Sequence, residues 1–506
     1  MTTPSHFPRG ADEPISPPPG CPAHGLGPGG LRRLYGPEAD SDLAGIYEKL
    51  RAEHGSVAPA LVHDDVPMWA VIGHTEALHM LRTGSHFTRD SRRLRVVQDG
   101  TLGPDNPLAP VMAWAPLISF AEGAEHQRVR GAITDALATI DDRGLRRFIH
   151  RSSQRLVNEF CETGTADLVS QFAEHLPMAV MCEVLGMPDE CNERLVQAGR
   201  DMTKGTETAV ESNEYVVSVL YRHTARRRAQ PEEDFTSRLL AHPAQLSDDE
   251  VAQNLRVVLI AAYEGTANLM ANVLRMVLTD PRFRAQLNGG QMTVPEAIEQ
   301  SLWDEPPFSA QLGYAATQDA ELGGQQIKAG DALIFVAAAG NVDPVVRPDL
   351  KASMAGNRAH LSFGSGAHEC PGQDIARAIA DVGVDALLMR LPDAELAVDE
   401  KELRWRQTIP ARHLVDLPVT FTPRPPQDVM LRPTMGRVPA PRTEWEVSSP
   451  PPRDQAERPA VGVPAQASAS DRSEQRPVPT PPTSPADQGE QPKGALQRLL
   501  RWWRGA

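Results

Sequence analysis

The sequence has few cysteines, and they are not arranged in pairs. Only five of the 506 residues are cysteine, at positions 21, 161, 182, 191 and 370. An odd number of scattered cysteines without a CxxC pair argues against a disulfide framework and favours reduced thiols. We therefore expect an intracellular chain in which each cysteine needs its own explanation.

An excess of basic charge and long apolar runs are also missing. The net charge is −15 and the isoelectric point is near 5.5, which argues against general nucleic-acid binding. The opening stretch MTTPSHFPRGADEPISPPPG is polar and proline-rich, so it lacks the apolar centre of a signal peptide. No later run has the length that a membrane span needs. These absences predict a cytoplasmic protein.

Composition divides the chain into four parts. A flexible segment is expected over 1–30, one large domain over 31–423, and a disordered tail rich in Pro, Ser and Gln over 424–492. The last part, 493–506, reads as a short basic amphipathic helix. Within the domain, helical periodicity dominates from about 40 to 285, and short strands separated by glycine turns follow after about 305.

One long helix carries the clearest boundary signals. Ser247 and Glu250 form a predicted capping box, with Leu246 and Val251 placed as a hydrophobic staple. The helix is expected to continue to Asp280, about 30 residues or roughly 45 Å. Apolar residues occur on every side of its middle, which predicts burial. Earlier in the chain, Pro177 should divide one helical stretch in two, and the second piece should end at Gly186.

The segment FGSGAHECPG, residues 363–372, sets Cys370 in an unusually stiff loop. Glycines let backbone N–H groups turn toward the sulfur and let the loop approach a flat macrocycle. The helix predicted to follow adds positive potential that favours a thiolate. A lone cysteine between glycines is more often a buried structural residue, so this reading depends on the rest of the motif.

The rest of the motif is present. Phe363, Gly366, His368, Cys370 and Gly372 match F-x-x-G-x-H-x-C-x-G at every fixed position. On this motif the chain resembles the cytochrome P450 family, and specifically its soluble bacterial class. The resemblance extends over roughly 30–423.

Three further segments support the resemblance. EHQRVR resembles the H-x-x-x-R of the family, which implies that His126 and Arg130 hold haem propionates. HLSFG implies a third propionate partner in His360. GNVDP, at 340–344, resembles the turn A-N-R-D-P.

The resemblance implies the fold, the cofactor and the reaction. The fold would be mainly α with small β-sheets around a long central helix. The cofactor would be haem b, an iron porphyrin whose axial ligand is the Cys370 thiolate. The protein would be an oxidoreductase, a monooxygenase that uses O₂ and two electrons from a ferredoxin and a ferredoxin reductase. Its substrate would be a small organic molecule bound by residues near 85–115, 200–225 and Phe308.

The sequence departs from the family at the helix expected near 295–304. Gln300 and Trp303 occupy the positions of the family's E-x-x-R ion pair, and no arginine occurs between Arg284 and Arg347. This resembles an actinobacterial subset of the family that lacks the pair. A buried ion pair is often replaceable by neutral groups that pack well. In addition, Tyr314 stands where many relatives have an arginine that binds a propionate.

The long helix also departs from the pattern A-G-x-[DE]-T. Glu264 keeps the acid, but Gly265 replaces the alcohol, and Thr266 follows about 100° further round the helix. The Thr266 hydroxyl either reaches the distal pocket through a kink or bonds to the carbonyl four residues earlier. The resemblance implies catalytic roles for Glu264 and Thr266.

These departures leave a second function open. The protein could be a haem-binding sensor or interaction protein with weak or lost turnover, linked to a small-GTPase signalling complex. The helix in GALQRLLRWWRGA could dock on a signalling protein, lie on an anionic membrane surface, fold back on the domain, or have no role. Deleting 494–506 and measuring co-sedimentation with anionic vesicles would separate these alternatives.

Overall fold

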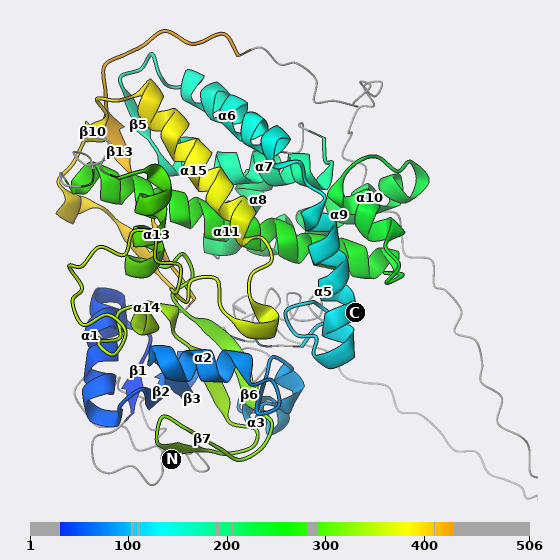
Figure 1. Ribbon diagram of the computed structural model, residues 1–506, viewed down its shortest axis with the longest axis vertical. Helices are drawn as coiled ribbons and strands as arrows, with labels where there is room; N and C mark the ends of the chain where they lie inside the picture. Colours follow the sequence, from blue (N-terminus) through cyan, green and yellow to red (C-terminus); the bar gives the residue numbers. More distant parts are fainter. Residues whose placement is uncertain are drawn as a thin grey trace, which may run out of the picture.

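The computed structural model of the protein describes residues 31–429, except 103–105, 107, 109–111, 113, 189–191, 205, 281, 282, 284–291 and 409. The predicted N-terminal segment, the C-terminal helix and the predicted tail beyond residue 429 lie outside the described residues. The boundary predicted at 424 is too early, because the chain binds the domain up to Gln427: the N–H of Arg424 donates to the carbonyl of Cys161 at 2.8 Å, and Nδ2 of Asn158 donates to the carbonyl of Gln427 at 2.7 Å. The described part is mainly helical with small sheets, as the sequence predicts (Figure 1).

The helices are α1 (Pro37–His54), α2 (His74–Arg82), α3 (Arg95–Gln98), α5 (Gly123–Ala138), α6 (Asp142–Asn158), α7 (His175–Leu185), α8 (Asn192–Lys204), α9 (Ala209–Ala229), α10 (Phe235–Ala241), α11 (Asp248–Thr279), α13 (Val294–Asp304), α14 (Ala337–Gly340) and α15 (Gln373–Arg390). The strands are β1 (Arg32–Arg33), β2 (Val57–Val62), β3 (Val66–Val71), β4 (Phe87–Thr88), β5 (Thr165–Asp167), β6 (Gln311–Ala316), β7 (Ala320–Leu322), β8 (Gln325–Ile327), β9 (Ala332–Phe335), β10 (Glu395–Leu396), β11 (Trp405–Gln407), β12 (Arg412–Leu414) and β13 (Pro418–Thr420).

The largest sheet has six strands in the order β1-β2-β3-β9-β6-β4. Its two faces are both covered because side chains alternate along each strand. In β2, Ala58 and Ala60 join a cluster with Leu50 of α1, whereas Val57 joins a second cluster with Met80 of α2. The remaining strands form the smaller sheets β10-β13-β5, β11-β12 and β7-β8.

The long helix α11 crosses the molecule between the sheet and the other large helices (Figure 1). It has 32 residues and begins with the predicted capping box between Ser247 and Glu250. It packs against α7, α9, α13 and α15. Within the described residues, α11 alone has the length and apolar composition of a membrane-spanning helix, but 56% of its apolar window is buried inside the protein. Its apolar surface is therefore that of a core helix.

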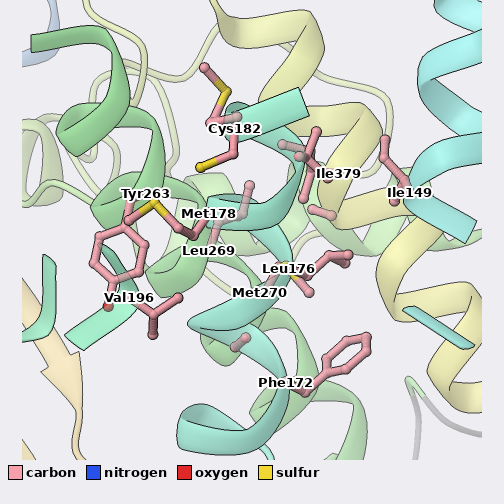
Figure 2. Packing of buried hydrophobic residues seen from close by; sticks show 14 of the residues in the cluster. Ile149, Phe172, Leu176, Met178, Cys182, Val196, Tyr263, Leu269, Met270 and Ile379 are labelled. Carbon is pink, nitrogen blue, oxygen red and sulfur yellow. The ribbon is translucent and has the colours of Figure 1, made fainter. Parts of the chain in front are cut away.

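The main hydrophobic core surrounds α11. Figure 2 shows part of it, with Met178 and Cys182 from α7, Leu269 and Met270 from α11, and Ile379 from α15. Fully burying side chains of this size stabilises the fold by about 1.5–3 kcal/mol each. This core fixes α11 and α15 relative to each other.

The predicted boundaries near Pro177 are close to those observed. A π-turn over Val169–Ala173 precedes α7, and Pro177 lies within the first turn of α7. The interruption therefore falls a few residues before the proline, because a helix tolerates proline in its first turn. Gly186 ends α7 in a left-handed conformation, with φ of 78°, as the sequence predicts.

Candidate functional site

Cys370 is held in a tight loop between α14 and α15, which reaches down to α2 (Figure 1). Gly364 and Gly366 have left-handed backbone angles, with φ of 69° and 70°, which glycine adopts without steric cost. A Cβ added at Gly366 would lie 2.3 Å from the carbonyl oxygen of Leu81. The N–H of Cys370 donates to the carbonyl of Phe363 at 2.9 Å and closes the loop.

Charged groups around the Cys370 thiol oppose the effect of its burial. Burial raises the pKa of the thiol, whereas the N–H of Gly372 and the guanidinium groups of Arg130 and Arg377 act to lower it. Gly372 is the N-cap of α15, so the positive end of this helix faces the loop. These groups favour the thiolate over the thiol once a metal ion replaces the proton.

Two histidines lie against each other beside this loop. The rings of His126, from α5, and His368 have centroids 4.2 Å apart. Both Nε2 atoms are buried and have no hydrogen-bond partner among the described residues. Burial, together with the neighbouring His368 and Arg130, lowers the pKa of His126 to about 4. Buried nitrogens without partners indicate that a polar ligand belongs here.

Arg130 lies one turn after His126 on the same face of α5. Burial lowers the pKa of its guanidinium, while Cys370 and Glu369 act to raise it. We find no salt bridge for Arg130 within the described part of the chain. A cysteine loop bordered by Arg130, by His126 with its unpartnered Nε2 and by His368 fits a haem. The sulfur would bind the iron, and these side chains would bind the propionates. The structure thus brings His126, Arg130, His368 and Cys370 together.

The expectation for His360 is corrected by the structure. Its Nε2 atom lies 3.0 Å from Oε2 of Glu299, and its Nδ1 atom accepts the N–H of Ser362 at 3.2 Å. Its side chain is only 1% exposed. Both ring nitrogens are therefore occupied by protein groups, and His360 is not placed to hold a propionate. The sequence motif predicted a histidine at position 360, but its contact with Glu299 makes this histidine part of a protein network.

Gln300 and Trp303 both bind the segment 350–358 of the chain. Oε1 of Gln300 accepts the N–H of Met354 at 2.7 Å, and its Nε2 donates to Asp304 at 2.9 Å. The indole N–H of Trp303 donates to the carbonyl of Asn357 at 2.8 Å. Trp303 is 2% exposed. Neutral hydrogen bonds and aromatic volume thus fill the positions of the family's ion pair.

A network of charged side chains surrounds Glu299, the residue before Gln300. Arg377 of α15 donates to Oε1 of Glu299 at 2.6 Å, and His360 binds the other oxygen. Burial raises the pKa of Glu299, but these hydrogen bonds outweigh burial and lower it to about 2. The guanidinium of Arg377 also lies 4.6 Å from the ring centroid of Phe363. The network joins α13, α15 and the cysteine loop, and sequence reasoning missed it.

The middle of α11 faces two other segments. A Cβ added at Gly265 would lie 2.9 Å from the Phe308 ring, so this ring occupies the space of the missing side chain. Thr266 is 2% exposed. We find no hydrogen bond between its hydroxyl and the carbonyl of Ala262, the alternative that the sequence left open.

Glu264 has a partner that the sequence did not indicate. Nε2 of His413, on β12, lies 3.3 Å from Oε1 of Glu264, and their side chains are 15% and 20% exposed. Nearby, Asn268 of α11 donates to the carbonyls of Pro307 and Arg412 at 2.7 and 3.2 Å. Together these contacts hold β12 and the Phe308 segment against α11.

Comparison with known proteins agrees with this arrangement. No protein-family model matches the chain. The chain is 30% identical over 352 residues to the mycinamicin IV hydroxylase/epoxidase of Micromonospora griseorubida. This alignment covers 67% of this chain and 84% of that enzyme. It is 27% identical over 409 residues to the cytochrome P450 CYP107DY1 of Priestia megaterium, covering 76% and 97%. A solved myxobacterial cytochrome P450 in complex with myristic acid is 26% identical, with a TM-score of 0.67 and coverage of 77% and 98%.

Proposed function

We propose a function for this chain on the premise that it belongs to the cytochrome P450 family. The family assigns the cofactor, a haem b whose iron is bound by a cysteine thiolate, and the enzyme class, a monooxygenase. The predicted P450 fold is confirmed. The finer proposal is that Cys370 is this ligand and that His126, Arg130 and His368 hold the propionates. The observation that carries it is the buried histidine pair beside the cysteine loop, in which Nε2 of His126 has no partner among the described residues.

Haem with an axial thiolate supplies the activation of O₂ for transfer of one oxygen atom to an organic substrate. The protein's own part is to deliver protons and exclude water. Glu264 is the proposed proton-transfer group, because it lies in the oxygen-binding turn of α11 and faces His413. Nε2 of His413 lies 3.3 Å from Oε1 of Glu264, so the pair would offer a path for a proton between α11 and β12. Thr266, which is buried on the same helix, would supply a hydroxyl.

The substrate is proposed to be a small, largely apolar organic molecule. One relative is named for its action on mycinamicin IV, and one solved neighbour holds myristic acid. In this chain Phe308 lies against α11 where a side chain at 265 would be, so an aromatic wall is expected in the pocket. The electron donors are proposed to be a cytoplasmic ferredoxin and its reductase.

A second function is favoured by Gly265. Without a hydroxyl at this position, protons can reach the wrong oxygen atom and release peroxide, which would suit a haem-binding sensor or interaction protein better than an efficient enzyme. A spectral substrate screen of the holoprotein, followed by assays with NADH, ferredoxin and reductase, tests both functions. Oxygenated product supports the monooxygenase. NADH consumption with peroxide alone, across all binding compounds, would overturn it.

Restoring a hydroxyl at position 265 is expected to require a second change. Gly265→Thr alone should crowd the Phe308 ring, since even a Cβ would approach it to 2.9 Å, and overpacking typically costs about 1–3 kcal/mol. Gly265→Thr combined with Phe308→Ala should lower the peroxide formed per NADH consumed. Phe308→Ala alone is the control. An unchanged ratio in the double variant, at equal haem content, would mean that Thr266 or His413 already serves the proton path.

A further inference from the structure

Tyr314 stands where the sequence leads us to expect an arginine, but an arginine from another strand lies on it. The guanidinium carbon of Arg89, which directly follows β4, is 4.7 Å from the centroid of the Tyr314 ring. The two strands are neighbours, with Thr88 paired to Ala315. A positive charge is thus present beside position 314, although it comes from a residue 225 positions away in the chain.

Arg89 is buried and fixed in place by neutral groups. It is 6% exposed. Its Nε donates to the carbonyl of Ser119 at 3.2 Å, and its Nη1 donates to the carbonyl of Leu312 at 2.6 Å. The ring of Phe120 lies 5.9 Å away. These contacts hold the guanidinium rigidly but provide no negative charge.

The charge of Arg89 is not balanced by the protein in the part that the structure describes. No salt bridge of the Arg89 guanidinium is found among those residues, and the nearest carboxylate, that of Glu122, binds the main-chain N–H of Arg89. A buried charge without a counter-ion is costly, and removal of a partner from a buried pair typically destabilises strongly. A rigidly held arginine without a salt bridge is suited to a carboxylate or phosphate ligand.

Arg89 also belongs to the same cluster as the residues near Cys370. Oε1 of Glu122 accepts the main-chain N–H of Arg89 at 2.5 Å and the hydroxyl of Thr88 at 2.9 Å. The same oxygen lies 3.5 Å from Nε2 of His368. One carboxylate therefore connects Arg89 with the histidine in the cysteine loop.

We propose that Arg89 binds a carboxylate of the haem and replaces the arginine that position 314 lacks. This inference rests on the proposed function, because it requires haem at Cys370. Arg89 would then be a cofactor-binding residue that complements His126, Arg130 and His368. The Tyr314 ring packs against the guanidinium, and its own hydroxyl donates to Gln311 at 2.9 Å.

The test measures how fast the full-length holoprotein loses haem to an excess of apomyoglobin, followed by the Soret band. Arg89→Gln should lose haem about tenfold to a hundredfold faster than the unmodified protein, as expected for a lost charge-assisted hydrogen bond. Arg89→Lys should fall between them. Arg93→Gln, which changes an exposed arginine nearby, should match the unmodified protein. Arg89→Gln combined with Tyr314→Arg should recover most of the haem retention.

A chemical control separates ligand binding from a structural role. When the proteins are reconstituted with haem dimethyl ester, whose carboxylates are blocked, Arg89→Gln and the unmodified protein should lose it at equal rates. Acceleration of the same size with the ester, or no acceleration with haem, would overturn the proposal. If the unmodified protein fails to give a thiolate-type haem spectrum at all, the proposed function fails first. Thermal melts of the haem-free proteins show whether Arg89→Gln still folds.

Discussion

Replacement of Cys370 by alanine is expected to abolish the thiolate-type absorption of the reduced, carbon monoxide-bound protein. Cys370 is the cysteine that the described structure places in the glycine loop at the N-terminus of α15, beside Arg130 and Arg377. Loss of its sulfur would remove the axial ligand, and among the described residues the other cysteines, Cys161 and Cys182, are buried in the helical core. The measurement is the reduced carbon monoxide difference spectrum at equal protein concentration.

Two buried cysteines provide matched controls for this experiment. Cys161 and Cys182 are fully buried in the helical core, so Cys161→Ala and Cys182→Ala should cost about 1 kcal/mol of stability. They should leave the position of the absorption band unchanged. A thiolate spectrum that survives in Cys370→Ala, or disappears in either control, would show that the ligand has been assigned to the wrong residue.

Replacement of Glu299 by glutamine should destabilise the fold by about 3 kcal/mol, the lower end of the range for breaking a buried ion pair. The lower end applies because the Arg377 side chain remains 12% exposed and can be partly hydrated. The change leaves Arg377 without its counter-ion and removes a hydrogen-bond acceptor from His360. Urea unfolding of the haem-free proteins measures the loss. Glu395→Gln, at an exposed glutamate of β10, should change stability by less than about 0.5 kcal/mol.

The stability difference at Glu299 should also depend on pH with a definite sign. The pKa of Glu299 is lowered from 4.5 to about 2 in the folded protein. A lowered folded-state pKa contributes stability above the unfolded-state value, and this contribution is lost as the pH falls toward the folded-state value. The difference between the unmodified protein and Glu299→Gln should therefore be largest above pH 5 and shrink between about pH 4.5 and 2. A constant difference across this range would exclude the proposed ion pair as its source.

The parts of the fold that could be predicted are those whose signals are local in the chain. The capping box at Ser247, the left-handed end at Gly186 and the glycines around Cys370 each act through neighbouring residues. Their chemistry determines the backbone directly, so the sequence pattern is sufficient. The long central helix and the cysteine loop follow from these signals.

The parts that could not be predicted depend on partners far away in the chain. His360 matched a motif position, but Glu299, 61 residues earlier, takes its ring nitrogen. His413 gave no sequence signal, because a lone histidine on a short strand has meaning only when Glu264 lies beside it. Arg89 is similar, since its contact with Tyr314 spans two paired strands. These pairs form only when strands and helices pack together, so a pattern of neighbouring residues in the sequence does not predict them.

The contact between Gly366 and Leu81 has a consequence for cooperativity. The cysteine loop touches α2, which covers one face of the large sheet, while α15 anchors the other end of the loop in the helical core. Haem binding would stabilise every part of the fold that forms its site. Because the cysteine loop contacts both the core at the sheet and the helical core, the two cores should then unfold together as one cooperative unit. Hydrogen exchange of the β2 and β3 amides should therefore slow when haem is added, although neither strand contains a proposed haem contact.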